Sequence, residues 1–159
     1  MNYYELFGFS ESPKVDKSLL AKKYFELQKK FHPDFFTQAS ADEKEAVLEK
    51  SATINKAFSI FQDADKTLQY FLSCKGLITD DEKFRLPDDF LIEMMELNEQ
   101  LDDGSKDQIK QITDSIYHAV KGIIENYNDK TISPAELESL KVYYYKKKYL
   151  HRILDRLES

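Results

Sequence analysis

Apolar residues recur with a helical period along most of this chain, and no strand-like alternation of apolar and polar residues appears before residue 80. One helical face carries apolar residues spaced four, three and four positions apart: Leu20, Tyr24, Leu27 and Phe31. Asp16 is a suitable N-cap for this helix. Pro33 ends it, because proline has no amide hydrogen and disfavours helical geometry at the preceding residue. We therefore expect a helix over about 16–31, followed by an exposed loop that carries His32 and Asp34.

Three further helical patterns complete the first half of the chain. A short aromatic helix is expected over residues 2–9, and another short helix over about 65–75, where Gly76 suits the position just past the helix end. Between them, a long helix begins at the capping box formed by Ser40 and Glu43. The two long helices should pack as an antiparallel pair, which the two short helices cover.

The long helix that begins at Ser40 has one apolar face. Its members are Val47, Ile54, Phe58 and Phe61, with Ser51 in the missing turn. Asn55 and Lys56 are expected to point away from this face.

The second half of the chain begins after a polar connector, residues 77–87, which closes with Pro87. Three helical patterns joined by short turns follow and predict an antiparallel three-helix bundle over 88–159. The last helix starts at a capping box of Ser133 and Glu136. We therefore predict an all-α protein with a first domain over 1–76, a linker over 77–87 and a second domain over 88–159.

The helix predicted from residue 88 to about 101 has more apolar residues than one core face needs. Its core stripe is Phe90, Met94, Leu97 and Leu101. At about 100° per residue, Leu91, Ile92 and Met95 fall roughly opposite this stripe. Either the helix is buried on both sides, or it offers an apolar patch to a partner. We favour the partner, because a domain of this size has too few other helices to bury both faces.

Charge is distributed unevenly among the predicted helices. The helix with the apolar surplus carries seven acidic and no basic residues from Asp88 to Asp103, so a partner with a basic rim around an apolar pocket would fit it. The last helix has five basic and no acidic residues between Lys141 and Arg152, which we interpret as a solvated face that partly complements the acidic helix. The first long helix carries a basic face beside the expected loop: Lys14, Lys17, Lys22, Lys23, Lys29 and Lys30. Because this face has one sign and ends at an exposed loop, it indicates an acidic partner.

Composition narrows the possible functions of the 159-residue chain. It is 42% hydrophobic and 33% charged, with only four glycines and four prolines, which favours an all-helical protein. The net charge of −6 argues against general nucleic-acid binding. Cys74 is the single cysteine, so no intramolecular disulfide forms, and no cysteine–histidine cluster has the spacing of metal ligands. No apolar run is long enough to span a membrane.

An enzymatic role for His32 and Asp34 is not supported by their surroundings. A general acid–base pair needs a pocket and an oriented partner. No nucleophile or phosphate-binding glycine loop is near them in the sequence, so we expect no catalytic residue, no metal and no cofactor.

The order of motifs in the first half resembles a J domain over roughly residues 2–75. The carrying segments are the aromatic helix YYELFGF at 3–9, the basic helix, the tripeptide His32-Pro33-Asp34, and INKAF at 54–58. In J domains the matching surface docks on a DnaK-type chaperone ATPase and stimulates ATP hydrolysis. The resemblance thus implies a chaperone-binding role for His32, Pro33, Asp34, Lys22, Lys23, Lys29 and Lys30.

The whole chain resembles the HscB family of co-chaperones. The glycine–phenylalanine linker and cysteine repeats of DnaJ-like proteins are missing, and FLIEMMELNEQLD at 90–102 is similar to the family's characteristic helix. In that family this helix and an aromatic residue of the last helix bind the iron–sulfur cluster scaffold protein, IscU. The residues that the resemblance implies here are Leu91, Ile92, Met95, Glu96, Glu99 and Tyr149.

The implied function is that of an adaptor without enzymatic activity. It would bind the scaffold, deliver it to the specialised DnaK-type chaperone HscA and stimulate the chaperone's ATPase, which promotes cluster assembly and transfer. A J-domain co-chaperone for a different client protein is the alternative. The lack of the N-terminal cysteine pairs of some eukaryotic relatives favours a cytoplasmic, bacterial-type protein, with the mitochondrial matrix as the other location.

Overall fold

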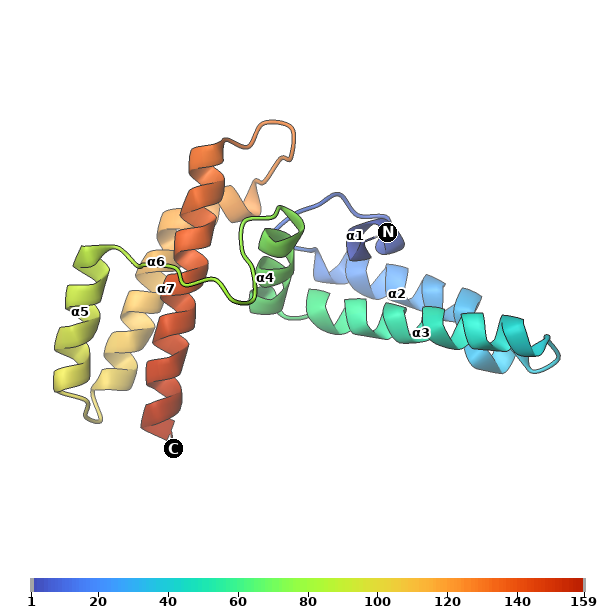
Figure 1. Ribbon diagram of the computed structural model, residues 1–159, viewed down its shortest axis with the longest axis horizontal. Coiled ribbons are helices and arrows are strands. Elements are labelled where there is room, and N and C mark those ends of the chain that lie inside the picture. The colour runs from blue at the N-terminus through green and yellow to red at the C-terminus, as the bar shows by residue number, and fades with distance from the viewer. Residues whose placement is uncertain (1, 159) are drawn as a thin grey trace. The chain divides into compact units, whose positions relative to one another are not determined.

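The computed structural model describes residues 2–158 and contains only helices within that range. Seven α-helices and one short 3-10 helix follow one another along the chain (Figure 1). This confirms the predicted all-α fold, with a J domain followed by a helical bundle. Contacts divide the chain into two compact units, and the division falls after Phe71, inside α4 (Ala64–Cys74). Each unit is described by itself.

The first unit is built around two long helices. Helix α2 (Lys17–Phe31) and helix α3 (Ala41–Phe61) run antiparallel, joined by the 3-10 helix η1 (Pro33–Phe36), and α1 (Tyr3–Phe7) contacts both long helices (Figure 1). Their core holds a cluster of aromatic rings together with buried aliphatic residues: Tyr4, Phe7, Leu20, Ile54, Phe61, Leu68 and Phe71. The predicted antiparallel pair is therefore confirmed.

Capping groups set the helix ends where the sequence predicts them. The Asp16 carboxylate accepts from the Leu19 amide at 2.8 Å, and the Ser40 hydroxyl accepts from the Glu43 amide at 3.2 Å. These bonds satisfy backbone donors that have no partner within the first helical turn. Gly8 ends α1 with a φ of +74°, a left-handed conformation that glycine adopts without a steric cost.

Two positions of α3 contact α2 in ways that the helical period does not predict. Ala57 is fully buried, whereas Phe58, expected in the core stripe, is half-buried and stacks flat on Tyr24 of α2, with ring centroids 3.8 Å apart. Asn55 is exposed and lies outside the apolar face, as expected, and its side-chain oxygen accepts from the Tyr24 hydroxyl at 2.7 Å and from the Gln28 amide at 3.0 Å. Positions 55 and 58 lie one turn apart on the flank of α3 that faces α2, so both join the two helices.

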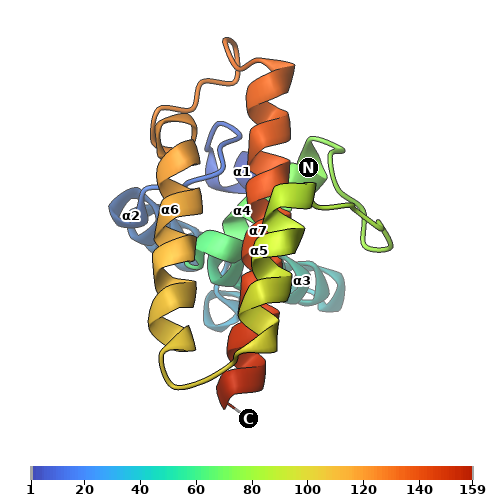
Figure 2. The ribbon, with the colours of Figure 1, turned by 90° about the vertical axis from the view of Figure 1, so that its left-hand side faces the viewer.

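The second unit contains the three-helix bundle that the sequence predicts. Helix α5 (Asp88–Glu99) lies along α6 (Ser105–Glu125) and α7 (Pro134–Glu158) (Figure 2). All three helices contribute to one core cluster: Phe90, Met94, Leu97, Ile109, Leu150 and Ile153. The capping box at the start of α7 is complete, because Ser133 and Glu136 exchange side-chain–backbone hydrogen bonds of 3.1 Å in both directions.

The segment 77–87 packs on the second unit. Ile78 is buried, and the Glu82 carboxylate ion-pairs with the Lys141 ammonium at 2.6 Å and accepts from the Tyr145 hydroxyl at 2.9 Å. The ring centroids of Phe84 and Tyr145 lie 4.6 Å apart. These contacts hold the segment against α7 and make it part of the surface of the second unit. The domain limits that we derived from composition stay predictions.

Candidate partner-binding sites

The His-Pro-Asp segment forms a short 3-10 turn at the end of α2. His32 leaves helical geometry with φ −70° and ψ 132°, and the expected loop is instead the 3-10 helix that begins at Pro33. The Asp34 amide donates to Nδ1 of His32 at 3.2 Å, and the Asp34 carboxylate lies 3.6 Å from the same nitrogen. The turn therefore fixes one ring nitrogen of His32 and leaves Nε2 for a partner. The Asp34 side chain is 86% exposed.

The lysines predicted to bind the chaperone lie on the surface of α2. Lys23 forms an ion pair with Glu26 at 3.8 Å. Within residues 2–158, no ion pair engages Lys22, Lys29 or Lys30. The ammonium of Lys29 instead lies 4.6 Å from the centroid of the Phe25 ring. This face therefore keeps positive charge that an acidic partner can neutralise.

Two exposed phenylalanines accompany this basic face, and sequence reasoning missed them. Phe25 is 61% exposed on α2, and Phe35 is 67% exposed in the 3-10 turn, where its ring meets that of His32 edge to face. Positions 22, 25, 29 and 32 are spaced three, four and three apart, so Phe25 lies in the same row as Lys22, Lys29 and His32. The signal in the sequence was an aromatic residue in a basic row, outside the apolar stripe.

Helix α5 has its apolar surplus on the outside. Ile92 and Met95 are 57% and 62% exposed, Leu91 is half-buried, and Glu96 and Glu99 are exposed. We call these five residues the α5 strip. The alternative of a helix buried on both sides is contradicted, because only Phe90, Met94 and Leu97 of this helix are buried.

Tyr149 of α7 lies beside α5. Its ring meets that of Phe90 edge to face, with centroids 6.2 Å apart, and its hydroxyl accepts from the Asn98 amide at a long 3.4 Å. The side-chain oxygen of Asn98 is buried without a hydrogen-bond partner. The fold thus brings the predicted aromatic residue of the last helix next to the helix of the strip, although 50 positions or more separate Tyr149 from Leu91, Ile92, Met95, Glu96 and Glu99.

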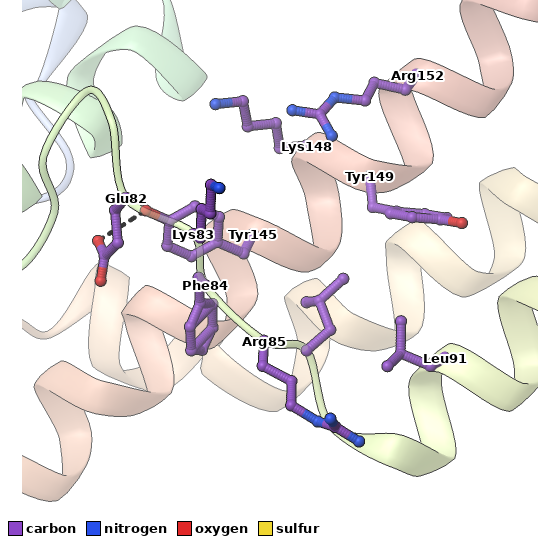
Figure 3. Close-up of a pocket in the computed structure, with 10 residues that line it drawn as sticks. Glu82, Lys83, Phe84, Arg85, Leu91, Tyr145, Lys148, Tyr149 and Arg152 are labelled. Carbon is purple, nitrogen blue, oxygen red and sulfur yellow. Dashed lines mark hydrogen bonds between the residues drawn. The ribbon is translucent and has the colours of Figure 1, made fainter.

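A cavity of about 410 Å³ adjoins the strip (Figure 3). Its walls come from the segment 82–86, from the start of α5 and from α7, and it is lined by Glu82, Lys83, Phe84, Arg85, Leu86, Leu91, Tyr145, Lys148, Tyr149 and Arg152. Leu91 and Tyr149 belong both to this lining and to the predicted scaffold-binding set. Sequence reasoning missed the cavity, because its walls come together only in the folded bundle.

The one carboxylate in the cavity lining is held within the second unit. Hydrogen bonds from Lys141 and Tyr145 lower the pKa of Glu82. Burial, followed by the hydrogen bond to Glu82, raises the pKa of Tyr145 to about 12. Glu82 is therefore ionised near neutral pH and fixes the segment against α7.

Residues 2–158 contain neither a metal-binding cluster nor a membrane-spanning helix. No group of three histidine, cysteine, aspartate or glutamate side chains is placed to hold a metal ion. No helix in this range combines the length and the apolar character that crossing a membrane requires.

Comparison with known proteins places the chain in a family. Residues 86–158 match the family model described as the HSCB C-terminal oligomerisation domain. The co-chaperone protein HscB homolog of Shewanella halifaxensis is 32% identical over 99% of this chain and 95% of its own length. The chain belongs to the HscB family. Family membership confirms the resemblance that the sequence showed.

Solved structures of HscB proteins share this fold. The chaperone HscB from Vibrio cholerae is 27% identical and superposes with a TM-score of 0.60 over 99% of both chains. The crystal structure of the human co-chaperone HscB matches with a TM-score of 0.77, covering 99% of this chain and 81% of the human one, at 24% identity. The human structure therefore supports the fold alone.

Proposed function

We propose that this HscB-family chain is an adaptor between two proteins. The α5 strip and Tyr149 bind an iron–sulfur cluster scaffold of the IscU kind. The surface around His32 binds a DnaK-type chaperone of the HscA kind and stimulates its ATPase, which promotes cluster assembly and transfer. The observation that carries the proposal is the exposure of Ile92 and Met95 on the family's characteristic helix.

The chemistry of the α5 strip supports a protein partner. Two neighbouring apolar side chains, more than half exposed, gain free energy when a partner covers them, at about 25 cal/mol per Å² of apolar surface. Glu96 and Glu99 flank them and are exposed, so a partner with a basic rim gains charge complementarity and orientation. An apolar centre with a charged rim is the usual anatomy of a protein–protein interface.

The chaperone surface is supported by different features. His32 and Asp34 are held by the 3-10 turn at a rigid helix end, so the partner meets a preorganised pair of side chains. Lys22, Lys29 and Lys30 leave positive charge on the neighbouring face, which attracts an acidic surface over distances of about 8–10 Å in physiological salt.

Carrying both surfaces on one chain explains the adaptor role. A scaffold bound to the strip is delivered at high effective concentration to a chaperone that binds the other surface. The protein itself then needs no catalytic residue, metal or cofactor. The bacterial HscB relatives support a cytoplasmic location.

The test is a binding titration with the IscU-type scaffold. We expect the triple variant Leu91→Ala, Ile92→Ala, Met95→Ala to lose at least about tenfold in affinity, because it removes the apolar centre of the strip. The matched control is Leu48→Ala on α3, which also truncates an exposed leucine, 57% accessible, and should leave scaffold affinity unchanged. Unchanged affinity of the triple variant would contradict the scaffold assignment. If wild-type protein stimulates the chaperone but does not bind the scaffold, the chain is a J-domain co-chaperone for another client.

A further inference from the structure

The cavity beside the α5 strip has a positively charged rim. Four of its lining residues are cationic: Lys83, Arg85, Lys148 and Arg152. Arg85 forms an ion pair with Asp88 at 2.8 Å, between two side chains that are 81% and 76% exposed. Among the described residues, no carboxylate lies within ion-pair distance of Lys83, Lys148 or Arg152. Three positive charges at the cavity are therefore available to a ligand.

Nearby carboxylates do not neutralise this rim. Glu82 is engaged by Lys141, which lies outside the lining, and by Tyr145. Asp80 and Arg152 both act on the pKa of Tyr144, which burial raises, but they form no ion pair with each other in the described structure. Asp80 therefore lies close enough to affect the electrostatic potential near Tyr144, but it leaves Arg152 without an ion-pair partner within residues 2–158.

Charged and apolar side chains line the cavity together. Figure 3 shows Lys148 and Arg152 projecting from the same side of α7, whereas Arg85 points away from them. Leu86, Leu91 and Tyr149 provide apolar and aromatic surface between the walls. A ligand that suits this arrangement carries a carboxylate next to an apolar group, as an acidic segment of a protein does.

The position of the cavity identifies the protein that would supply this segment. Leu91 and Tyr149 line the cavity and also belong to the proposed scaffold surface, so the cavity is continuous with that surface. The charges at the two ends of this combined surface have opposite signs. Glu96 and Glu99 lie toward the end of α5, whereas the cavity that Lys148 and Arg152 line meets α5 at Leu91.

We propose that the cavity binds an acidic segment of the scaffold protein, so that the scaffold contacts the acidic residues of the α5 strip as well as the basic residues of the cavity. This inference rests on the proposed scaffold-binding function and adds a second, oppositely charged contact to it. Opposite charges at the two ends admit the scaffold in one orientation, because the reversed orientation would bring like charges together.

The experiment compares two charge-reversal variants of the full chain in titrations with the IscU-type scaffold. Lys148→Glu with Arg152→Glu should weaken binding about tenfold at roughly 50 mM salt and reduce the salt dependence of the affinity. The control, Lys110→Glu with Lys121→Glu, makes the same change in net charge at exposed positions of α6 outside the cavity lining, and should change affinity less than about twofold. Far-UV circular dichroism checks that both variants fold.

A third variant tests the cavity as a whole. Lys83 comes from the segment 82–86 and not from α7, and Lys83→Glu should weaken binding about threefold. If Lys83→Glu has no effect on scaffold affinity, only the charges on α7 contribute to binding, and the proposal that the cavity is the binding site is wrong. Equal losses in the cavity and control variants would reduce the effect to overall charge and also overturn the inference.

The remaining outcomes separate this inference from the proposed function. If the triple alanine variant of the strip loses affinity and the Lys148→Glu, Arg152→Glu variant does not, the scaffold function stands and the cavity inference fails. If wild-type protein does not bind the scaffold, both fail. Scaffold variants with one acidic residue changed to lysine can identify the partner residue. The variant that changes this residue should bind the Lys148→Glu, Arg152→Glu protein better than it binds the wild-type protein.

Discussion

The two candidate binding surfaces of this HscB-family protein differ in how the chain builds them. The chaperone surface comes from one continuous stretch, residues 22–35, in which a helix end and a 3-10 turn present charged side chains. The scaffold surface combines one face of α5 with residues of α7 that are about 50 positions away in the sequence. The first surface depends on local geometry, whereas the second depends on the packing of the bundle.

This difference has a consequence for what each surface tolerates. Substitutions at His32 and Asp34 act on a half-buried and an exposed side chain and should spare folding, because neither belongs to the buried core of the first unit. In α5, core residues and strip residues are neighbours in the sequence. A substitution at a core position should therefore lower stability, whereas a substitution at the adjacent strip position should lower scaffold binding.

The sharpest comparison, and the largest expected effect, is between Met94 and Met95. Met94 is fully buried and Met95 is 62% exposed. We expect Met94→Ala to destabilise the second unit by about 2–5 kcal/mol, because it leaves a cavity in the core. Met95→Ala should change stability by no more than about 0.5 kcal/mol and lower scaffold affinity instead. Denaturant unfolding and a scaffold titration measure both effects, and a stability loss at Met95 would show that the strip is part of the core.

Substitution of His32 should abolish most of the chaperone stimulation without any loss of scaffold binding. His32→Gln changes the ring that accepts from the Asp34 amide and that leaves Nε2 for a partner. We expect stimulation of the chaperone ATPase to fall at least about tenfold, while the free energy of unfolding changes by less than about 0.5 kcal/mol. Steady-state ATP hydrolysis is the measurement. Retained stimulation would place the chaperone contact elsewhere.

A smaller effect is expected at Phe35, which adds apolar area to the charged surface. Phe35 is 67% exposed and its ring meets that of His32 edge to face. Phe35→Ala should lower ATPase stimulation about two- to fivefold, because it removes apolar contact but no charge. The same change to Leu19, which is 44% exposed near the start of α2, is a control that should have no effect.

The smallest effect concerns the Glu82 contact that fixes one wall of the cavity. Hydrogen bonds to Lys141 and Tyr145 lower the pKa of Glu82 from an ordinary 4.5. The stability from this group is therefore present above pH 4.5 and is lost as the pH falls through the lowered, folded-state pKa. Glu82→Gln should flatten the pH dependence of the unfolding midpoint in this acidic range. An unchanged profile would mean that the contact does not hold the segment in solution.

Local signals in the sequence predicted most of the fold. The caps at Asp16, Ser40 and Ser133 and the proline after His32 are read from neighbouring residues, and each helix begins or ends where they indicate. The contacts of Asn55 and Phe58 with α2 were not predicted, because a position on the flank of an apolar stripe faces solvent or a neighbouring helix according to how the two helices pack. Helical periodicity alone does not contain that information.

The candidate sites divide in the same way. The apolar surplus at Leu91, Ile92 and Met95 could be predicted, because three apolar residues opposite a core stripe indicate a second buried face or a partner-binding surface. The cavity was not visible, because Lys83, Lys148 and Arg152 meet only when the segment 82–86 folds onto α7. The basic stretch of α7 was interpreted as a solvated face, and the structure gives part of it a defined place beside the strip.

The central claim, that two separable surfaces on one chain couple a scaffold to a chaperone, is tested most directly by the chaperone ATPase rate measured with and without the IscU-type scaffold. We expect wild-type protein to stimulate the HscA-type ATPase and to stimulate it further with scaffold. The Leu91→Ala, Ile92→Ala, Met95→Ala variant should keep the first effect and lose the second, and His32→Gln should lose both. If the strip variant keeps the full scaffold-dependent stimulation, the α5 strip does not couple the scaffold to the chaperone.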